Sequence, residues 1–308
     1  MINKETLHEQ FIWLSAFCVN YEECDYANVD PSAESSYADN RPIANEPLIV
    51  SDINAEYGLR SVSCLNDENV WTCCSDDMMR LYNLKGELVK SVHTKSKNAP
   101  YDIAVTKSGD LVHTDNTDKT VNFVKNTKIQ TVIKLHGSSP HGICISSSGD
   151  FLIVINSDAD KQTNVVRFSG PTKKQTFKYS DEGQPLYSPG GNNKFICENR
   201  NGDICVSDVE AHSLVVINKE GKLRFTYTGH PHIAWGSLNP VGIAADRHGQ
   251  VLTADIISHY IHIMDQDGQF LHYIDNCYLY APIGLCVDTR DILFVAEYYR
   301  GKVKGIQY

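Results

Sequence analysis

The chain has 308 residues, of which 42% are hydrophobic and 21% are charged, and its formal net charge is -10. This is the composition of an ordinary globular protein, and the acidic balance argues against a general affinity for nucleic acid. No stretch of the sequence approaches the roughly 20 apolar residues that a membrane-spanning helix requires.

Residues 1–43 are expected to form an N-terminal extension ahead of the main domain. The run Phe11–Val19 is apolar, but it follows Glu5 and Glu9 rather than the basic residues of a secretory signal. We therefore expect a short amphipathic helix over residues 4–20, followed by a disordered stretch. The chain is expected to be cytoplasmic.

The ten cysteines form no recognisable framework. Cys73 and Cys74 are adjacent, no C-x-x-C pair occurs, and most of the others lie in apolar strand patterns. This usage fits reduced, buried thiols in a cytosolic protein better than disulfides or a structural zinc site. We expect no bound metal and no cofactor.

From residue 44 onward the sequence repeats itself. The pattern is P-x-G-I-small, followed by Gly or Asp seven residues after the first Gly, and its clearest copies begin at Pro240 and Pro282. The copies lie about 40 to 50 residues apart, which is the length of a propeller blade of four short strands. The third residue of the pattern, called the anchor position below, is occupied by Ser61, Asp102, Gly142, Phe195, Gly242 and Gly284.

The residue classes after the anchor position have a physical reason. The next residue is always a branched aliphatic one: Val62, Ile103, Ile143, Ile196, Ile243 or Leu285. The one after it is always small: Ser63, Ala104, Cys144, Cys197, Ala244 or Cys286. The innermost strand of a propeller blade needs this alternation, because one side chain fills the gap to a neighbouring blade and the next must fit where blades crowd. The sequence therefore predicts an all-β, six-bladed propeller over residues 44–308.

Each copy continues with a second strand, as in Asp110–Asp115, Asp203–Asp208 and Gln250–Asp255. The acidic residues at the ends of these strands are Asp115, Asp208, Asp255 and Glu297. We expect them to accept backbone N–H groups of the following turn rather than to bind metal, since short acidic side chains commonly do so.

The last copy ends at Tyr308, after its third strand. The segment Pro47–Ile53 reads as a strand with no blade of its own. We expect it to pair with the last blade and to close the ring, because closure removes exposed strand edges.

The repeat resembles the NHL repeat, most closely over Pro240–Phe270 and Pro282–Glu297. With Glu198–Val206 and Gly221–Gly229, it resembles the C-terminal propeller of tripartite-motif proteins, in particular those of bivalve molluscs. The resemblance implies a propeller that selects protein substrates or RNA. In that family a RING finger, B-boxes and a coiled coil precede the propeller, and the RING recruits a ubiquitin-conjugating enzyme.

This chain departs from that plan in residues 1–43. The only histidine and cysteine residues there that could coordinate zinc are His8, Cys18 and Cys24. A RING needs eight ligands and even one structural zinc takes about four. We therefore expect that the chain is not an enzyme and that it has no ubiquitin-ligase activity by itself. We expect it to act as a non-catalytic module that recognises partners.

The loops that join second to third strands, and those that lead into the next blade, must open on one face of the disc. They are rich in aromatic residues, including Tyr278 and Tyr280, and contain Arg300. Such residues dominate the binding energy of protein interfaces, and Trp235 is expected to be an exposed contact. The predicted partner-binding residues are Tyr101, His141, His232, Trp235, His259, Tyr298, Tyr299 and Arg300.

Two alternatives remain open. Basic residues such as Lys119, Lys161, Lys173 and Lys174 also fit single-stranded RNA binding, although the acidic total favours reading them as solvated lysines on outer strands and loops. A propeller hydrolase similar to calcium-dependent lactonases would need carboxylates that converge on the central channel, and Asp102 is the one acid at an anchor position.

Overall fold

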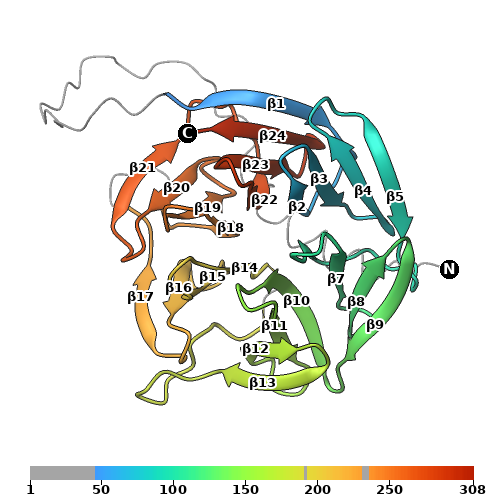
Figure 1. Ribbon diagram of the computed structural model, residues 1–308. Helices are drawn as coiled ribbons and strands as arrows, with labels where there is room; N and C mark the ends of the chain where they lie inside the picture. Colours follow the sequence, from blue (N-terminus) through green and yellow to red (C-terminus); the bar gives the residue numbers. More distant parts are fainter. Residues whose placement is uncertain (1–45, 191–192, 231–235) are drawn as a thin grey trace, which may run out of the picture. The chain divides into compact units, whose positions relative to one another are not determined.

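The computed structural model describes residues 46–190, 193–230 and 236–308. Residues Asn45–Tyr308 form one compact unit. Six four-stranded antiparallel sheets surround a central axis, and no helix occurs in the described residues (Figure 1). The prediction of an all-β, six-bladed propeller is confirmed. The predicted helix within residues 1–43 lies outside the described residues.

The strands follow the predicted order from the axis outward in every blade. Blade 1 contains β2 (Ser61–Asn66), β3 (Asn69–Cys73), β4 (Met78–Asn83) and β5 (Leu88–His93). Blade 2 contains β6 (Ile103–Val105), β7 (Leu111–Asp115), β8 (Thr120–Lys125) and β9 (Lys128–Lys134). Blade 3 contains β10 (Ser138–Ile145), β11 (Phe151–Ser157), β12 (Thr163–Ser169) and β13 (Thr172–Phe177). Blade 4 contains β14 (Ile196–Glu198), β15 (Ile204–Asp208), β16 (Ser213–Ile217) and β17 (Leu223–Tyr227). Blade 5 contains β18 (Pro240–Ala245), β19 (Val251–Asp255), β20 (Ile261–Met264) and β21 (Phe270–Ile274). Blade 6 contains β22 (Pro282–Val287), β23 (Ile292–Glu297), β24 (Lys302–Gln307) and β1 (Leu48–Asn54).

Strand β1 closes the ring as predicted. It pairs antiparallel with β24, with Leu48 opposite Gln307 and Asn54 opposite Lys302. Ile53 is fully buried. The Ser51 hydroxyl also donates a hydrogen bond of 3.0 Å to the carbonyl oxygen of Leu84 in blade 1. The N-terminal strand therefore joins the last blade to the first.

The anchor glycines allow neighbouring blades to approach closely. A Cβ atom on Gly242 would lie 2.2 Å from the carbonyl oxygen of Ile283 in the next blade. A Cβ atom on Gly142 would lie 2.5 Å from the carbonyl oxygen of Lys194. Real Cβ atoms do not come so close to backbone, so these positions require glycine for packing.

Hydrophobic side chains fill the spaces between blades. Between blades 3 and 4 the core includes Leu152, Val165, Ile204 and Ile217, all essentially buried. Each such side chain stabilises the fold by about 1.5–3 kcal/mol through the hydrophobic effect. The long connection between these two blades adds Leu186 and Tyr187 to the same core. These contacts hold blades 3 and 4 together.

Eight cysteines in the described residues are free thiols. Cys64 of blade 1 and Cys286 of blade 6 face each other, with 2.8 Å between their sulfur atoms. Burial raises the pKa of the Cys64 thiol well above its ordinary value. A raised pKa favours the protonated form of the Cys64 thiol, which is a poorer nucleophile than the thiolate.

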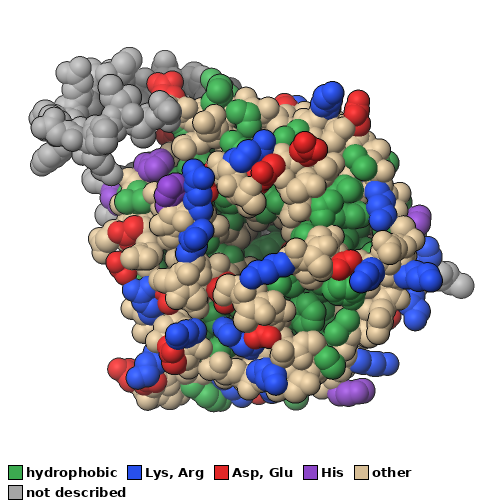
Figure 2. Space-filling model, in the orientation of Figure 1, with side chains coloured by type: hydrophobic (Ala, Val, Ile, Leu, Met, Phe, Trp, Pro, Cys, Tyr) green, Lys and Arg blue, Asp and Glu red, His purple; other side chains and the backbone are tan. Residues whose placement is uncertain are grey.

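The surface is hollowed where the axis of the ring emerges (Figure 2). In the part of the chain that the structure covers, no helix has the length and apolar character needed to cross a membrane.

Candidate functional site

The two faces of the disc carry different connections. The turns between first and second strands lie on one side, which we call the turn face. The loops between second and third strands, and those leading into the next blade, lie on the other side, which we call the loop face. This division follows from the antiparallel order of every blade.

Aromatic and cationic side chains gather on the loop face at blades 5 and 6. The Tyr280 ring lies 4.9 Å from the His259 ring and 6.1 Å from the Tyr299 ring, between centroids. The guanidinium carbon of Arg300 lies 5.1 Å from the Tyr280 centroid, within cation–π range. We call His259, Tyr278, Tyr280, Tyr299 and Arg300 the tyrosine cluster.

The loop that carries Tyr278 and Tyr280 is held by charged side chains of blade 6. Glu297 Oε1 accepts the Tyr280 N–H at 2.6 Å. Arg300 Nη1 and Lys304 Nζ both donate to the Tyr278 carbonyl oxygen, each at 2.8 Å. The Glu297 side chain is fully buried and that of Lys304 nearly so. These bonds fix the loop before any partner arrives.

The fixed loop presents its tyrosines to solvent. Tyr278 is 83% exposed and Tyr280 is 41% exposed. Tyr278 has a φ of 49° and Ala281 a φ of 47°, a left-handed conformation that non-glycine residues adopt only when their surroundings hold them there. A rigid, exposed tyrosine loses little conformational entropy on binding, which favours affinity.

Tyr298, which lies beneath the cluster, and His259, its most interior member, hold the exposed residues in place. Tyr298 is buried, so its predicted role as an exposed contact is wrong. Its ring packs edge-on against Tyr299 at 4.9 Å. His259 is half-buried, and its Nδ1 accepts the Ala281 N–H at 3.1 Å. Tyr299 is half-buried and Arg300 is exposed, as a contact residue should be.

Tyr101 and His141 are also buried, which corrects the prediction that they form part of an exposed site. Their rings pack edge-to-face at 4.7 Å where blades 2 and 3 meet. Tyr101 precedes the innermost strand β6, and His141 lies within the innermost strand β10. Burial raises the pKa of Tyr101 and lowers the pKa of His141 to about 4, so both side chains are neutral at physiological pH.

The two remaining predicted contacts, His232 and Trp235, lie outside the described residues. Tyr278 and Tyr280 were not among the predicted contacts, although they lie in a loop that the sequence placed on this face. The available signal was their position immediately before the Pro282 repeat, between two blades.

The predicted RNA-binding lysines do not form one surface. Lys119 Nζ forms an ion pair of 2.5 Å with Asp158 on the loop face. Lys161 lies in a loop on the same face, whereas Lys173 and Lys174 are exposed on β13, the outermost strand of blade 3. The cations are thus divided between a face and the rim.

Asp115, Asp208 and Asp255 accept backbone N–H groups of the following turn, as predicted, whereas Glu297 accepts the N–H of Tyr280 from the connection before β22. Asp115 accepts from Asp118 at 2.8 Å, and Asp255 accepts from Ile257 at 3.0 Å. Asp208 accepts the N–H of Ala211 in the following turn at 3.3 Å, and also that of Ser188, in the connection before β14, at 2.7 Å. Among the described residues, no group of three or more His, Cys, Asp or Glu side chains could hold a metal ion.

The blades, their closure and this loop face define a six-bladed β-propeller with an exposed aromatic surface. No protein-family model matches the chain. Over 118 residues it is 32% identical to B-box type zinc finger protein ncl-1 of Caenorhabditis elegans. The match covers 38% of this chain and 13% of that protein. The B-box is one of the parts of tripartite-motif proteins, so the match supports the resemblance at the level of the family.

Solved structures share the fold at low sequence identity. A streptogramin B lyase has a TM-score of 0.60 and 15% identity, covering 85% of this chain and 96% of the lyase. A gluconolactonase, XC5397 from Xanthomonas campestris, has a TM-score of 0.62 and 13% identity, covering 84% and 88%. The WD40 propeller domain of Doa1 has a TM-score of 0.60 and 11% identity, covering 86% and 98%. These neighbours show the propeller fold and nothing about activity.

Proposed function

We propose that this chain is a non-catalytic protein-interaction module of the NHL type, which binds a protein partner on its loop face. The observation that carries the proposal is the tyrosine cluster. Its exposed members, Tyr278, Tyr280 and Arg300, belong to the residue types that supply most binding energy in protein interfaces. Their loop is already fixed by Glu297 and Lys304.

The cluster suits a partner surface that combines apolar and acidic side chains. The tyrosine rings offer flat apolar area, and their hydroxyl groups and Arg300 offer hydrogen-bond donors. The similarity to a B-box protein supports a role in selecting partners for a tripartite-motif system, including a ubiquitin ligase assembled from other chains. A cytoplasmic location is part of the same proposal.

RNA binding and hydrolysis receive less support. Lys119 is neutralised by Asp158, and the other three predicted lysines are divided between the face and the rim. Asp102, the acid considered for a hydrolase, has both carboxylate oxygens occupied by protein donors. Exposed tyrosines could also stack on RNA bases, but single-stranded RNA binding needs a continuous positive surface beside them, and the predicted lysines are not gathered at the tyrosine cluster.

The test uses partner proteins recovered on the immobilised wild-type chain, each then purified and measured by biolayer interferometry. Tyr278→Ala removes an exposed ring and should cost about 2 kcal/mol of binding, or about a 30-fold increase in Kd. Tyr179→Ala is the matched control, because Tyr179 is also exposed but lies in the connection from blade 3 to blade 4.

Both variants should melt at the wild-type temperature, since neither ring is in the core. A partner that binds wild-type, Tyr278→Ala and Tyr179→Ala with one affinity does not use this surface. If every recovered partner behaves in that way, the proposal is wrong. Salt-dependent RNA binding that Tyr278→Ala leaves intact would favour the alternative.

A further inference from the structure

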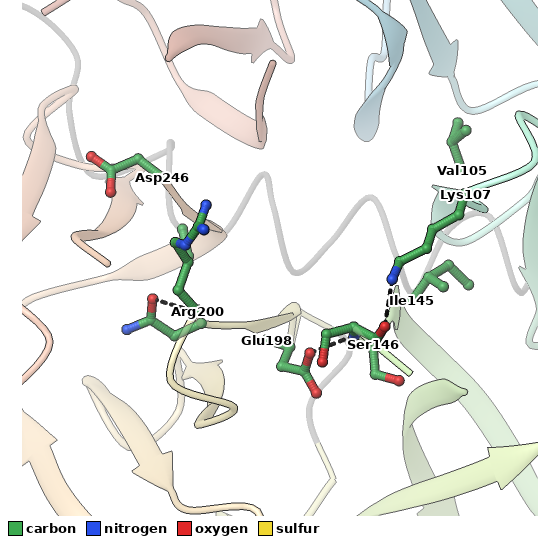
Figure 3. Close-up of a pocket in the computed structure, with 10 residues that line it drawn as sticks. Val105, Lys107, Ile145, Ser146, Glu198, Arg200 and Asp246 are labelled. Atoms are coloured by element: carbon green, nitrogen blue, oxygen red, sulfur yellow. Dashed lines mark hydrogen bonds between the residues drawn. The ribbon is translucent and has the colours of Figure 1, made fainter. Parts of the chain in front are cut away.

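A second site lies on the turn face, at the opposite end of the axis from the loop-face connections. Here the ends of the innermost strands of blades 2 to 5 enclose a pocket of about 390 Å³. Val105, Ile145 and Ala245 give it an apolar part. Lys107 of blade 2 extends to the Ser147 carbonyl oxygen on one side of the pocket, and Arg200 of blade 4 extends toward the side on which Asp246 lies (Figure 3). The pocket is large enough for a small organic molecule.

The two cations of the pocket are not neutralised by acids. Lys107 Nζ donates to the backbone carbonyl oxygen of Ser147 at 2.5 Å, which leaves its charge uncompensated. The Arg200 guanidinium has no hydrogen bond or ion pair to any residue that the structure describes. It is exposed, so its five N–H donors are available to a ligand.

Basic residues in the corresponding turns of blades 5 and 6 are different. Arg247 Nε lies 2.5 Å from an oxygen of Asp291, and Arg290 Nη2 lies 2.7 Å from one of Asp288. The first pair joins blades 5 and 6, and the second lies within one turn of blade 6. Lys107 also contacts the next blade, through the Ser147 carbonyl oxygen, but neither Lys107 nor Arg200 forms an ion pair with an acid among the described residues.

The acids that line the pocket are already engaged by protein donors. Glu198 Oε2 accepts the Ser147 N–H at 2.6 Å, and Arg167 Nη2 lies 3.9 Å from Oε1. Asp246 Oδ1 accepts two backbone N–H groups, each at 2.8 Å, from His248 and Gln250. Asp246 Oδ2 also accepts the Tyr308 hydroxyl at 3.4 Å. The donors that remain free in the pocket therefore belong to the cations.

We propose that this pocket binds a small organic anion through Arg200 and Lys107. The forked guanidinium of Arg200 matches the two oxygens of a carboxylate or phosphate group. Lys107 supplies a second positive charge, and Val105, Ile145 and Ala245 contact the carbon skeleton. Because the pocket lies on the turn face, this inference does not depend on the proposed protein partner.

Isothermal titration calorimetry at low ionic strength tests the proposal with two probes, citrate for carboxylates and inorganic phosphate for phosphates. At least one probe should bind the wild-type chain with a stoichiometry of about one. Arg200→Ala should weaken that binding at least 10-fold, a loss typical of a charge-assisted contact. Lys107→Gln, which keeps a donor for Ser147, should weaken it several-fold.

Lys85→Ala is the matched control. Lys85 is an exposed lysine on the same face, but it lies in the turn between β4 and β5 at the rim. Its removal should leave the Kd unchanged, and all three variants should keep the wild-type melting temperature within a few degrees. The proposal is overturned if neither probe binds, or if Arg200→Ala and Lys85→Ala change the Kd equally, which would indicate diffuse electrostatic attraction.

Discussion

Asp102 stands at an anchor position where Gly142, Gly242 and Gly284 occur in other blades. Its carboxylate connects three blades: Oδ1 accepts the Ser61 hydroxyl at 2.6 Å, and Oδ2 accepts the Ile143 N–H at 2.8 Å. These hydrogen bonds favour the charged form, but burial opposes them more strongly and raises the pKa of Asp102 from 3.8 to about 6. The contribution of Asp102 to the free energy of unfolding therefore depends on pH.

This pKa leads to a prediction about stability. Because the folded state binds the Asp102 proton more tightly than the unfolded chain does, the free energy of unfolding should fall as the pH rises from about 4 to about 6. A shift of about two pKa units corresponds to about 3 kcal/mol. Urea unfolding across this pH range should show the fall in the wild-type chain relative to Asp102→Asn, which cannot ionise there. Parallel pH profiles would show that Asp102 does not titrate in this range.

Gly242 supports a second prediction. Gly242→Ala should destabilise the fold by about 2–3 kcal/mol or more, because the new methyl group collides with the Ile283 carbonyl oxygen and the blades must move apart. Gly170→Ala is the control: its φ of 56° imposes backbone strain of about 1 kcal/mol, but no atom lies within 4 Å of its Cβ. Chemical denaturation should rank Gly242→Ala well below Gly170→Ala, and equal losses would mean that blade contact does not select glycine here.

At the scale of the strand, β1 determines whether the ring is closed. Removing residues 1–56 deletes β1, uncovers the edge of β24 and loses the buried Ile53. The melting temperature should fall strongly, and the exposed edge should promote aggregation. Removing residues 1–43 leaves β1 in place and should change the melting temperature by only a few degrees. Thermal unfolding with light scattering compares the two truncations, and equal stability would contradict closure by β1.

The strands and their order could be predicted from the sequence because the repeat is local. A branched aliphatic residue followed by a small one, such as Ile243 and Ala244, identifies the innermost strand of a blade, and the turn glycines mark where strands end. The strand at 47–53 belongs to no blade of its own, and the last blade lacks a fourth strand, so the sequence predicts that the two pair. The fold therefore followed from patterns within single blades.

Which loop residues are exposed could not be predicted in the same way. Tyr101 is covered by His141, which belongs to the next blade and is about 40 residues away. Tyr298 and Tyr299 are adjacent, yet one is buried and the other half-buried. The same limit applies to Arg200, since the sequence does not show that Arg247 has an acidic partner and Arg200 has none. Exposure and pairing between blades depend on the assembled ring.

At the scale of the whole molecule, the disc presents two faces of different chemistry. The loop face carries tyrosines and an arginine on a fixed loop, and the turn face carries a pocket with two uncompensated cations. The hydrogen bonds between turns, such as that from Ser147 N–H to Glu198, hold the blades in one arrangement. The two proposed sites therefore lie on opposite faces and share no residue.

The central claim is that a protein partner docks on the loop face at blades 5 and 6. Photo-crosslinking tests it directly, with benzoylphenylalanine placed at Tyr278 in one chain and at Tyr179 in another, both exposed positions. A purified partner that binds the wild-type chain should crosslink at position 278 and give little product at position 179. Crosslinking at position 179 with none at position 278 would contradict the account.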